Sequence, residues 1–331
     1  MTRRRTLAVL GVFAVATLIV TPFIGMETIP LRTVLGGGDS VESTVFWDIR
    51  LPRVLTAFIA GVALALSGMT FQAMFRNPLA TPFTLGVSSG ASLGATIAIQ
   101  TGFTFSLFLG ITGTTLAAFI GAMAAIGLVY GLTQVRQGFS TATMLLAGVA
   151  VTFFFASLIL FIQYTADVYN SFRMLRWIMG GMAAVDYESM FNVLPFAVAG
   201  LVILWFMTHE LNLLTIGDDL AMSRGVDVPK TKRLLFFTVS MMVGGVVAVC
   251  GPIGFVGMMV PHICRLMIGP DHRYLAPASC LFGGAFLAPC DTFARTVLAP
   301  AELPVGVVTA LLGGPFFIWL LLSGATNRDL A

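Results

Sequence analysis

Charged side chains are scarce in this sequence. Asp, Glu, Lys and Arg make up 10% of its 331 residues, whereas a soluble domain carries about 25%. Residues 83–135 contain none of the four, and this stretch is long enough for two crossings because a helix needs about 20 apolar residues to span a bilayer. With 57% apolar residues and a mean hydropathy of +0.95, the composition leaves no stretch for a separate soluble domain. It predicts one all-α, polytopic membrane domain over residues 1–331.

The motifs of an enzyme are also missing. The sequence contains no Gly-Lys pair, which excludes ATP binding through a P-loop of its own. No nucleophile, base and orienting acid occur together, so no catalytic residue is predicted. The four cysteines lack C-x-x-C spacing, and no histidine has a second ligand at helical spacing. We therefore expect no disulfide, metal site or resident cofactor. A net charge of +3 without a basic run argues against nucleic-acid binding.

Ionisable residues are almost absent from the centres of the apolar segments. Ion-coupled carriers generally need such a group in the membrane interior to hold a proton or sodium ion. Asp291 is the deepest acid, and Arg295 follows four residues later, a spacing at which the two can pair on one helix face. The sequence therefore favours a transporter whose energy comes from a partner protein.

Apolar segments separated by charges, Pro and Gly predict about ten crossings. The first follows Arg3, Arg4 and Arg5, and we expect an uncleaved helix because the apolar run continues well beyond the cleavage-like residues 14–16. The predicted spans are 7–26, 54–75, two within 85–135 separated near 102–114, 142–164, 190–208, 234–250, a short segment ending near Cys264, 275–292 and 305–322.

The distribution of Lys and Arg predicts the orientation. An even number of crossings places both termini on one side, and a cytoplasmic N-terminus leaves about twice as many basic residues inside as outside, as the positive-inside rule requires. We therefore expect both termini in the cytoplasm. The six basic residues left outside are Arg32, Arg50, Arg53, Arg173, Arg176 and Arg295.

One polar stretch on the predicted inner face, residues 211–229, carries apolar side chains beside charges. Gly217 is expected to end one short segment, Asp218 or Asp219 to cap the next, and Gly225 to stop it. A plain surface loop is one interpretation, but exposed apolar residues usually mark contact sites, which favours a docking helix for another protein. The apolar residues are Leu220, Ala221, Val226 and Val228.

Motifs along nearly the whole chain resemble the FecCD-type permeases, the membrane subunits of ABC importers for iron-siderophores, haem and cobalamin. The motifs are Arg50-Leu51-Pro52-Arg53, Gly68-Met69-Thr70-Phe71-Gln72-Ala73, Arg76-Asn77-Pro78-Leu79-Ala80, the stretch 85–91, Leu145-Leu146-Ala147-Gly148-Val149, Trp177-Ile178-Met179-Gly180-Gly181, the loop 217–226, the stretch 251–257 with Val260-Pro261-His262, and the stretch 302–310.

The resemblance implies a bacterial inner-membrane permease that works as a homodimer with two cytoplasmic ATPase subunits, which bind ATP and Mg²⁺, and one periplasmic binding protein. It assigns the loop after the sixth helix to the ATPase contact, and the cargo pathway to the second, third, fifth and tenth helices at the dimer interface. The coupling residues that follow are Leu213, Gly217, Asp218, Asp219, Ala221, Arg224, Gly225 and Val226; the pathway candidates are Ser88, Ser89, Phe161, Tyr164 and Thr309.

The resemblance further implies that outer arginines meet acidic residues of the binding protein, and Arg50, Arg53 and Arg295 match that pattern. An Arg fork binds a carboxylate bidentately, and opposite charges speed encounter. Arg50 and Arg53 could instead anchor a helix end at the lipid headgroups. Arg173 and Arg176 are additional outer arginines that could reinforce docking or attract an anionic ferric complex.

The function expected is therefore a permease subunit that carries a metal chelate inward while partner ATPases hydrolyse ATP. The order of expected cargoes is ferric siderophore, haem and cobalamin. The alternative is an ion-coupled secondary transporter of a bulky hydrophobic solute, which would work without a nucleotide-binding partner. Aromatic residues of the fifth helix could contact the cargo or face lipid; they include Phe153, Phe154, Phe155, Phe161 and Tyr164.

Overall fold

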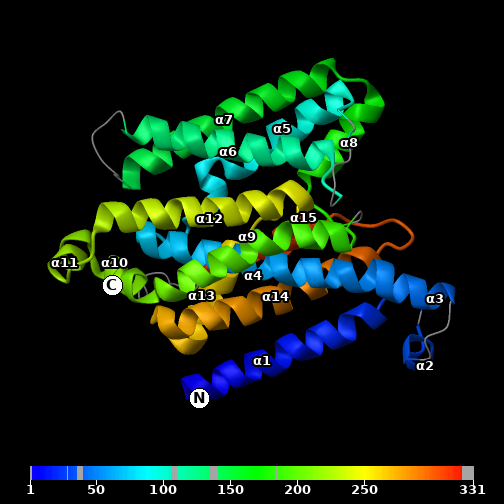
Figure 1. Cartoon of the computed structure of the whole chain (residues 1–331), viewed down its shortest axis with the longest axis horizontal. Coiled ribbons are helices and arrows are strands. Elements are labelled where there is room, and N and C mark those ends of the chain that lie inside the picture. The colour runs from blue at the N-terminus through cyan, green and yellow to red at the C-terminus, as the bar shows by residue number, and fades with distance from the viewer. Residues whose placement is uncertain are drawn as a thin grey trace.

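Long helices run back and forth between two ends of the molecule (Figure 1). The computed structural model describes residues 2–27, 29–35, 40–103, 105, 110–134, 141–182 and 185–322, and this part of the chain contains no β-strand. The helices are α1 (Arg3–Val20), α2 (Leu31–Leu35), α3 (Val41–Thr44), α4 (Leu51–Phe75), α5 (Val87–Thr101), α6 (Gly113–Gln134), α7 (Thr141–Thr165), α8 (Val168–Ile178), α9 (Tyr187–Phe206), α10 (Thr208–Ile216), α11 (Asp218–Ser223), α12 (Val228–Cys250), α13 (Val256–Ile268), α14 (His272–Thr296) and α15 (Val305–Leu322).

Every predicted crossing has a helix that matches it. The crossings correspond to α1, α4, α5, α6, α7, α9, α12, α13, α14 and α15. The expected break near 102–114 lies between α5 and α6, and α15 begins and ends where predicted. Several boundaries were wrong: α1 ends at Val20 rather than at residue 26, and α14 extends to Thr296. The helix α12 begins at Val228, because Asp227 caps it and Pro229 suits its first turn, and α13 continues to Ile268, where Gly269 adopts a φ of +91°.

The break between α12 and α13 follows directly from the sequence. Gly251 has a φ of +66°, which an L-residue rarely adopts, and Pro252 cannot continue a helix. Residues 251–255 are not helical, and α13 then starts as a helix of 13 residues, about 20 Å long and too short to cross a bilayer alone. As predicted, this short segment has to work inside the bundle.

The core is centred on α4 and α12. Of the most apolar stretch of each helix, 78% is buried in α4 and 72% in α12, compared with 28% in each of α6, α7 and α9. The exposed faces of α6, α7 and α9 therefore remain for lipid or for partner subunits. In Figure 1, α5, α6 and α7 lie on one side of α12 and α1 lies on the opposite side of the molecule.

Glycines bring the core helices into backbone contact. A methyl group at Gly61 of α4 would collide with the carbonyl of Gly283 in α14, and one at Gly68 would collide with the carbonyl of Gly257 in α13. Such close approach is characteristic of helix pairs in membranes. The hydrophobic effect does not drive helices together there, and small residues instead let the backbones approach closely and pack. The helix α4 is therefore held against two neighbours along its length.

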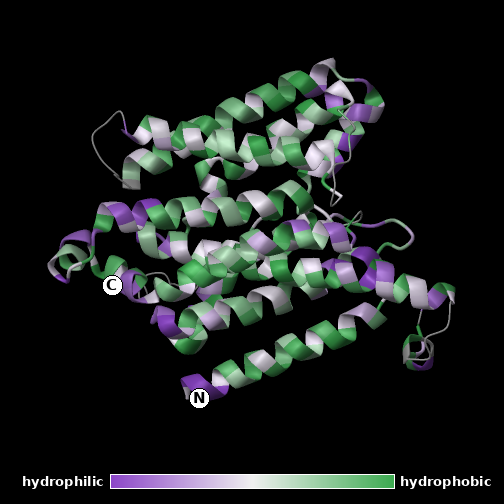
Figure 2. Cartoon of the chain, in the orientation of Figure 1, coloured by the Kyte–Doolittle hydropathy of each residue, from purple (hydrophilic) through white to green (hydrophobic). Residues whose placement is uncertain are grey.

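By length and composition, six of the described helical stretches are apolar enough to cross a membrane, and α13 and α15 are shorter apolar helices. Polar residues gather at the two ends of the helices and apolar ones cover the middle (Figure 2). We call the end that carries the start of α1, α10, α11 and the start of α14 the α11 end. The end that carries α3, the start of α4 and α8 is the α8 end.

Candidate functional site

The segment predicted as a coupling loop is largely helical and lies at the α11 end (Figure 1). It consists of α10 and α11, joined at Gly217, whose φ of +143° makes the sharp turn between them. After α11, Gly225 has a φ of +86°, and the N–H of Val226 bonds back to the carbonyl of Ala221, which closes the helix. The predicted stop at Gly225 is confirmed.

The apolar surface of this element differs from the predicted one. Ala221 and Val228 are buried, and Leu213 and Val226 pack against the core, so these four side chains stabilise the element from within. The exposed apolar side chains are those of Ile216, Leu220 and Met222, each half exposed or more. Helical phase explains the difference. Neighbouring residues of a helix are about 100° apart around its axis, so Leu220 and Ala221 can lie on different faces, and the sequence did not show which face was inward. We call these three side chains the coupling patch; Asp219, Arg224 and Gly225 are also exposed.

The predicted capping by aspartate was wrong. Asp218 and Asp219 lie in the first turn of α11 without capping it, and a carboxylate oxygen of Asp218 lies 2.6 Å from Nζ of Lys232 in α12. Lys232 is buried, so this ion pair satisfies an ammonium group that would otherwise be costly to desolvate. The pair joins the coupling element to α12.

A second joint, which sequence reasoning missed, connects the coupling element to α14. The side-chain amide of Asn212 in α10 donates to Oδ1 of Asp271 at 2.9 Å and accepts from the backbone N–H of His272 at 2.8 Å. Oδ1 of Asn212 also lies 2.8 Å from Nδ1 of His272. The one available signal was a polar Asn between Leu211 and Leu213. Its partner lies 60 residues away in sequence, so the sequence could not identify it.

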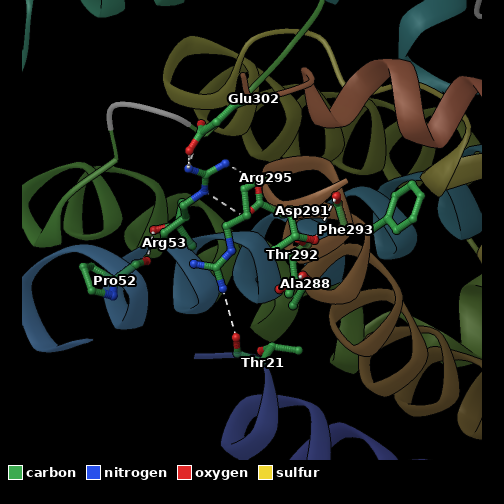
Figure 3. Close-up of polar contacts among 11 residues, drawn as sticks. Thr21, Pro52, Arg53, Ala288, Asp291, Thr292, Phe293, Arg295 and Glu302 are labelled. Atoms are coloured by element: carbon green, nitrogen blue, oxygen red, sulfur yellow. Dashed lines mark hydrogen bonds and ion pairs between the residues drawn. The ribbon is translucent and has the colours of Figure 1, made fainter. Parts of the chain in front are cut away.

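At the α8 end, Arg53 forms the centre of a buried ionic cluster (Figure 3). Its Nε and Nη2 donate to the two carboxylate oxygens of Asp291 at 2.8 and 3.0 Å. Its Nη1 donates to both oxygens of Glu302 at 3.1 and 3.0 Å. One guanidinium group therefore joins the start of α4, the end of α14 and the segment before α15. Arg53 is only 5% exposed.

The other two predicted docking arginines also have internal partners. Arg50 is 6% exposed and donates to the carbonyls of Pro22, Phe23 and Glu27. Arg295 is 8% exposed and donates to the carbonyl of Thr21 at 2.9 Å. The expected pair of Asp291 with Arg295 was wrong, because both oxygens of Asp291 accept hydrogen bonds from Arg53 instead.

A short amphipathic helix, α8, follows α7 at this end and was not predicted. Asp167 caps it by accepting from the N–H of Asn170, a pattern that sequence reading could have used. It exposes Arg173 and Arg176, and the guanidinium of Arg173 lies 5.7 Å from the ring centre of Tyr169. Arg176 is therefore accessible to a partner, unlike the other three candidate docking arginines.

The candidate pathway residues fall into different environments. Phe161 and Tyr164 are exposed on α7, near Phe153 and Phe154, whereas Phe155 is buried. Ser88 and Ser89 in α5 are half-buried. Thr309 is fully buried in α15 and donates to the carbonyl of Gly306. In this conformation Thr309 does not reach a surface along which cargo could pass.

Known proteins resemble this chain over almost its full length. The family model described as the FecCD transport family matches residues 9–323. The hemin transport system permease protein HmuU of Yersinia pestis is 37% identical over 92% of this chain and 91% of its own length. The vitamin B12 import system permease protein BtuC of Klebsiella pneumoniae is 38% identical over 96% of this chain and 94% of its own length.

A solved structure agrees with both sequence comparisons. An inward-facing metal-chelate type ABC transporter superposes with a TM-score of 0.86 at 30% identity, and the match covers 97% of this chain and 99% of that chain. The helix arrangement and the sequence comparisons thus point to one group of proteins. The chain belongs to the FecCD transport family.

Proposed function

We propose that this chain is the membrane subunit of an ATP-driven importer of metal chelates, working as a homodimer with two ATPase subunits and a periplasmic binding protein. The observation that carries the proposal is the coupling patch. It consists of exposed Ile216, Leu220 and Met222 on a short helical element at one end of the bundle. An apolar patch on a charged surface is costly unless a partner covers it, and the family supplies an ATPase as that partner.

The coupling element is suited to transmitting force. Gly217 and Gly225 give it sharp turns at both ends of α11, and Lys232 and Asn212 connect it to α12 and to the start of α14. A push on the coupling patch would therefore reach two long helices. The α11 end is then cytoplasmic, which agrees with the predicted orientation of both termini.

Binding-protein docking is proposed for the α8 end. Exposed Arg176 can meet an acidic residue directly. Arg53 can accept a partner carboxylate only by releasing Glu302, the more exposed of its two acidic partners. Arg50 and Arg295 support this surface by holding the segment after α1 in place. We propose that docking exchanges Glu302 for a carboxylate of the binding protein.

The cargo pathway is proposed at the interface of two copies, along the exposed aromatic face of α7 with Phe161 and Tyr164. Ser88 and Ser89 border it, and Thr309 would join it only if α15 rotates in another conformation. Relatives named for hemin and vitamin B12 support a large chelate as cargo. Ferric siderophores remain the first choice from the sequence.

Reconstitution tests the function directly. Proteoliposomes are prepared with the permease and its ATPase in the membrane, and cargo-loaded binding protein is supplied inside or outside the vesicles. When ATP is supplied, they should accumulate one of three chelates: a ferric siderophore, haem or cobalamin. Uptake that persists without ATP and follows an ion gradient would contradict the proposal. The matched variants are Leu220→Ser, which removes apolar area from the coupling patch and should lower uptake, and Ser223→Ala, which is exposed on the same helix and should not.

A further inference from the structure

Two joints hold opposite ends of α14. At the α11 end, the Asn212 amide binds Asp271 and His272, the two residues at which α14 begins. At the α8 end, Asp291 near the end of the same helix is held by Arg53. The two joints are separated by 19 residues of helix, or about 29 Å at 1.5 Å per residue. A single helix therefore connects the coupling element with the ionic cluster.

The joint at Asn212 is specific in its chemistry. Asp271 caps α14 by accepting from the N–H of Arg273, and the N–H of His272 is one of the donors that a helix start leaves without an intrahelical partner. Asn212 supplies an acceptor for that donor and a donor for the cap residue. The Arg273 guanidinium holds the pKa of Asp271 well below its usual range, so the cap is a carboxylate at neutral pH. An amide at position 212 thus fits both neighbours, and another carboxylate there would not.

Between the joints, α14 is braced against α4. Gly283 lies so close to Gly61 that neither position has room for a methyl group. Pro277 and Pro289 lie inside α14, which nevertheless continues as one helix through both. A helix braced in this way passes a displacement of its start along its length rather than absorbing it, because packed interiors are nearly incompressible.

We propose that Asn212 is the positioning residue through which the coupling element holds the start of α14, so that movement of α10 and α11 is passed along α14 to Arg53 and Glu302. The proposal rests on the function proposed above. It assigns to one amide the connection between the ATPase contact and the docking end. Thermodynamic linkage then requires that ATP changes the affinity for the binding protein by the same factor as the binding protein changes the affinity for ATP.

The test measures that factor in the full complex with its ATPase, reconstituted in proteoliposomes. In the unmodified complex, binding of fluorescently labelled, cargo-loaded binding protein should change by about 5- to 150-fold between the nucleotide-free and ATP-bound states, the range typical of coupled sites. Asn212→Ala should bring this factor close to 1. Thr215→Ala is the matched control, because Thr215 is exposed on the same helix and its hydroxyl bonds only to its own helix.

A pair of exchanges separates the hydrogen bond from general stability. Asn212→Asp places two carboxylates in contact and should abolish the coupling factor. The double variant Asn212→Asp, Asp271→Asn keeps a carboxylate facing an amide, and Asn also caps helices well, so the factor should return to at least half of its original value. A normal factor in Asn212→Ala, or no recovery in the double variant, would overturn the inference. An unmodified complex that shows no ATP-dependent binding would instead overturn the proposed function.

Discussion

The two ends of the bundle differ in which side chains they bury and which they expose. The α8 end contains charged groups that are buried and paired with one another, as in the contact of Arg53 with Asp291 and Glu302. The α11 end leaves apolar side chains of the coupling patch exposed beside charges. The Arg53 cluster is paired within the chain, whereas the coupling patch is uncovered without a partner. Burial therefore separates the charges that hold the fold together from the side chains that are free to meet another subunit.

The same comparison predicts how each end fails. Removing one member of a buried ion pair leaves the other without compensation, whereas changing an exposed residue mainly affects binding. Substitutions in the buried Arg53 cluster at the α8 end should therefore lower the free energy of unfolding. Substitutions at the coupling patch should lower uptake with little loss of stability.

The largest effect is expected from Asp291→Ala, which leaves Arg53 with only Glu302 as an acidic partner. Loss of one partner of a buried pair costs about 3–5 kcal/mol, measured as the free energy of unfolding in mixed detergent micelles. The double variant Arg53→Met, Asp291→Leu should be more stable than Asp291→Ala, because apolar residues can replace a buried pair. A loss below about 1 kcal/mol in Asp291→Ala would show that the α8 end is open to water.

A smaller effect is expected midway between the two ends, where α4 contacts α13. Gly68→Ala places a methyl group against the carbonyl of Gly257, and such overpacking costs about 1–3 kcal/mol. Gly11→Ala in α1 is the control, since no atom lies within 4 Å of its added methyl group, and Ala favours the helix. Unfolding of both variants in the same detergent compares them directly, and equal stabilities would contradict the close contact of α4 with α13.

The helices were predictable because each depends on local sequence. The charge-free stretch before Val135, the Gly251-Pro252 break and the run 305–322 each give a helix or a break where expected. Ends that depend on capping were less predictable, as Val228 and Ile268 show. The amphipathic α8 was missed because it has only 11 residues, too few to be read as a crossing.

The site was predictable only where its features are local. The turn glycines of the coupling element could be assigned from the sequence, but the inward face of α11, with Ala221, could not. The environment of Arg53 depends on residues 238 and 249 positions away, and nothing near Arg53 in sequence indicates that it is buried. Long-range pairing of this kind is what a single sequence does not contain, so surface arginines and interior ones looked alike.

Two neighbouring aspartates at the α11 end, Asp218 and Asp219, differ in the same way, because Asp218 is paired with buried Lys232 and Asp219 is exposed. Asp218→Ala leaves buried Lys232 without its partner and should cost about 1–3 kcal/mol, with faster hydrogen exchange in α11 and in the first turns of α12. Asp219→Ala changes an exposed carboxylate and should alter stability by less than about 0.5 kcal/mol, while lowering uptake if that carboxylate contacts the ATPase. Similar exchange in the two variants would contradict the role of Lys232 in anchoring α11.

The smallest effect, and one that leaves stability unchanged, is expected from Arg173→Gln combined with Arg176→Gln in α8. Both side chains are exposed at the proposed outer end, where they would raise the encounter rate of an anionic chelate or an acidic docking surface without forming the core. Salt should remove this contribution, because the Debye length falls from about 10 Å at 0.1 M to about 3 Å at 1 M. The initial uptake rate of the double variant should therefore fall at low salt and approach that of the unmodified protein at high salt.

The control is Arg233→Gln. Arg233 is exposed at the opposite end, so this variant should leave the uptake rate unchanged at both salt concentrations. A decrease that persists at high salt would mean that α8 contributes contacts rather than charge, and would place docking there even though three of the four candidate arginines are buried.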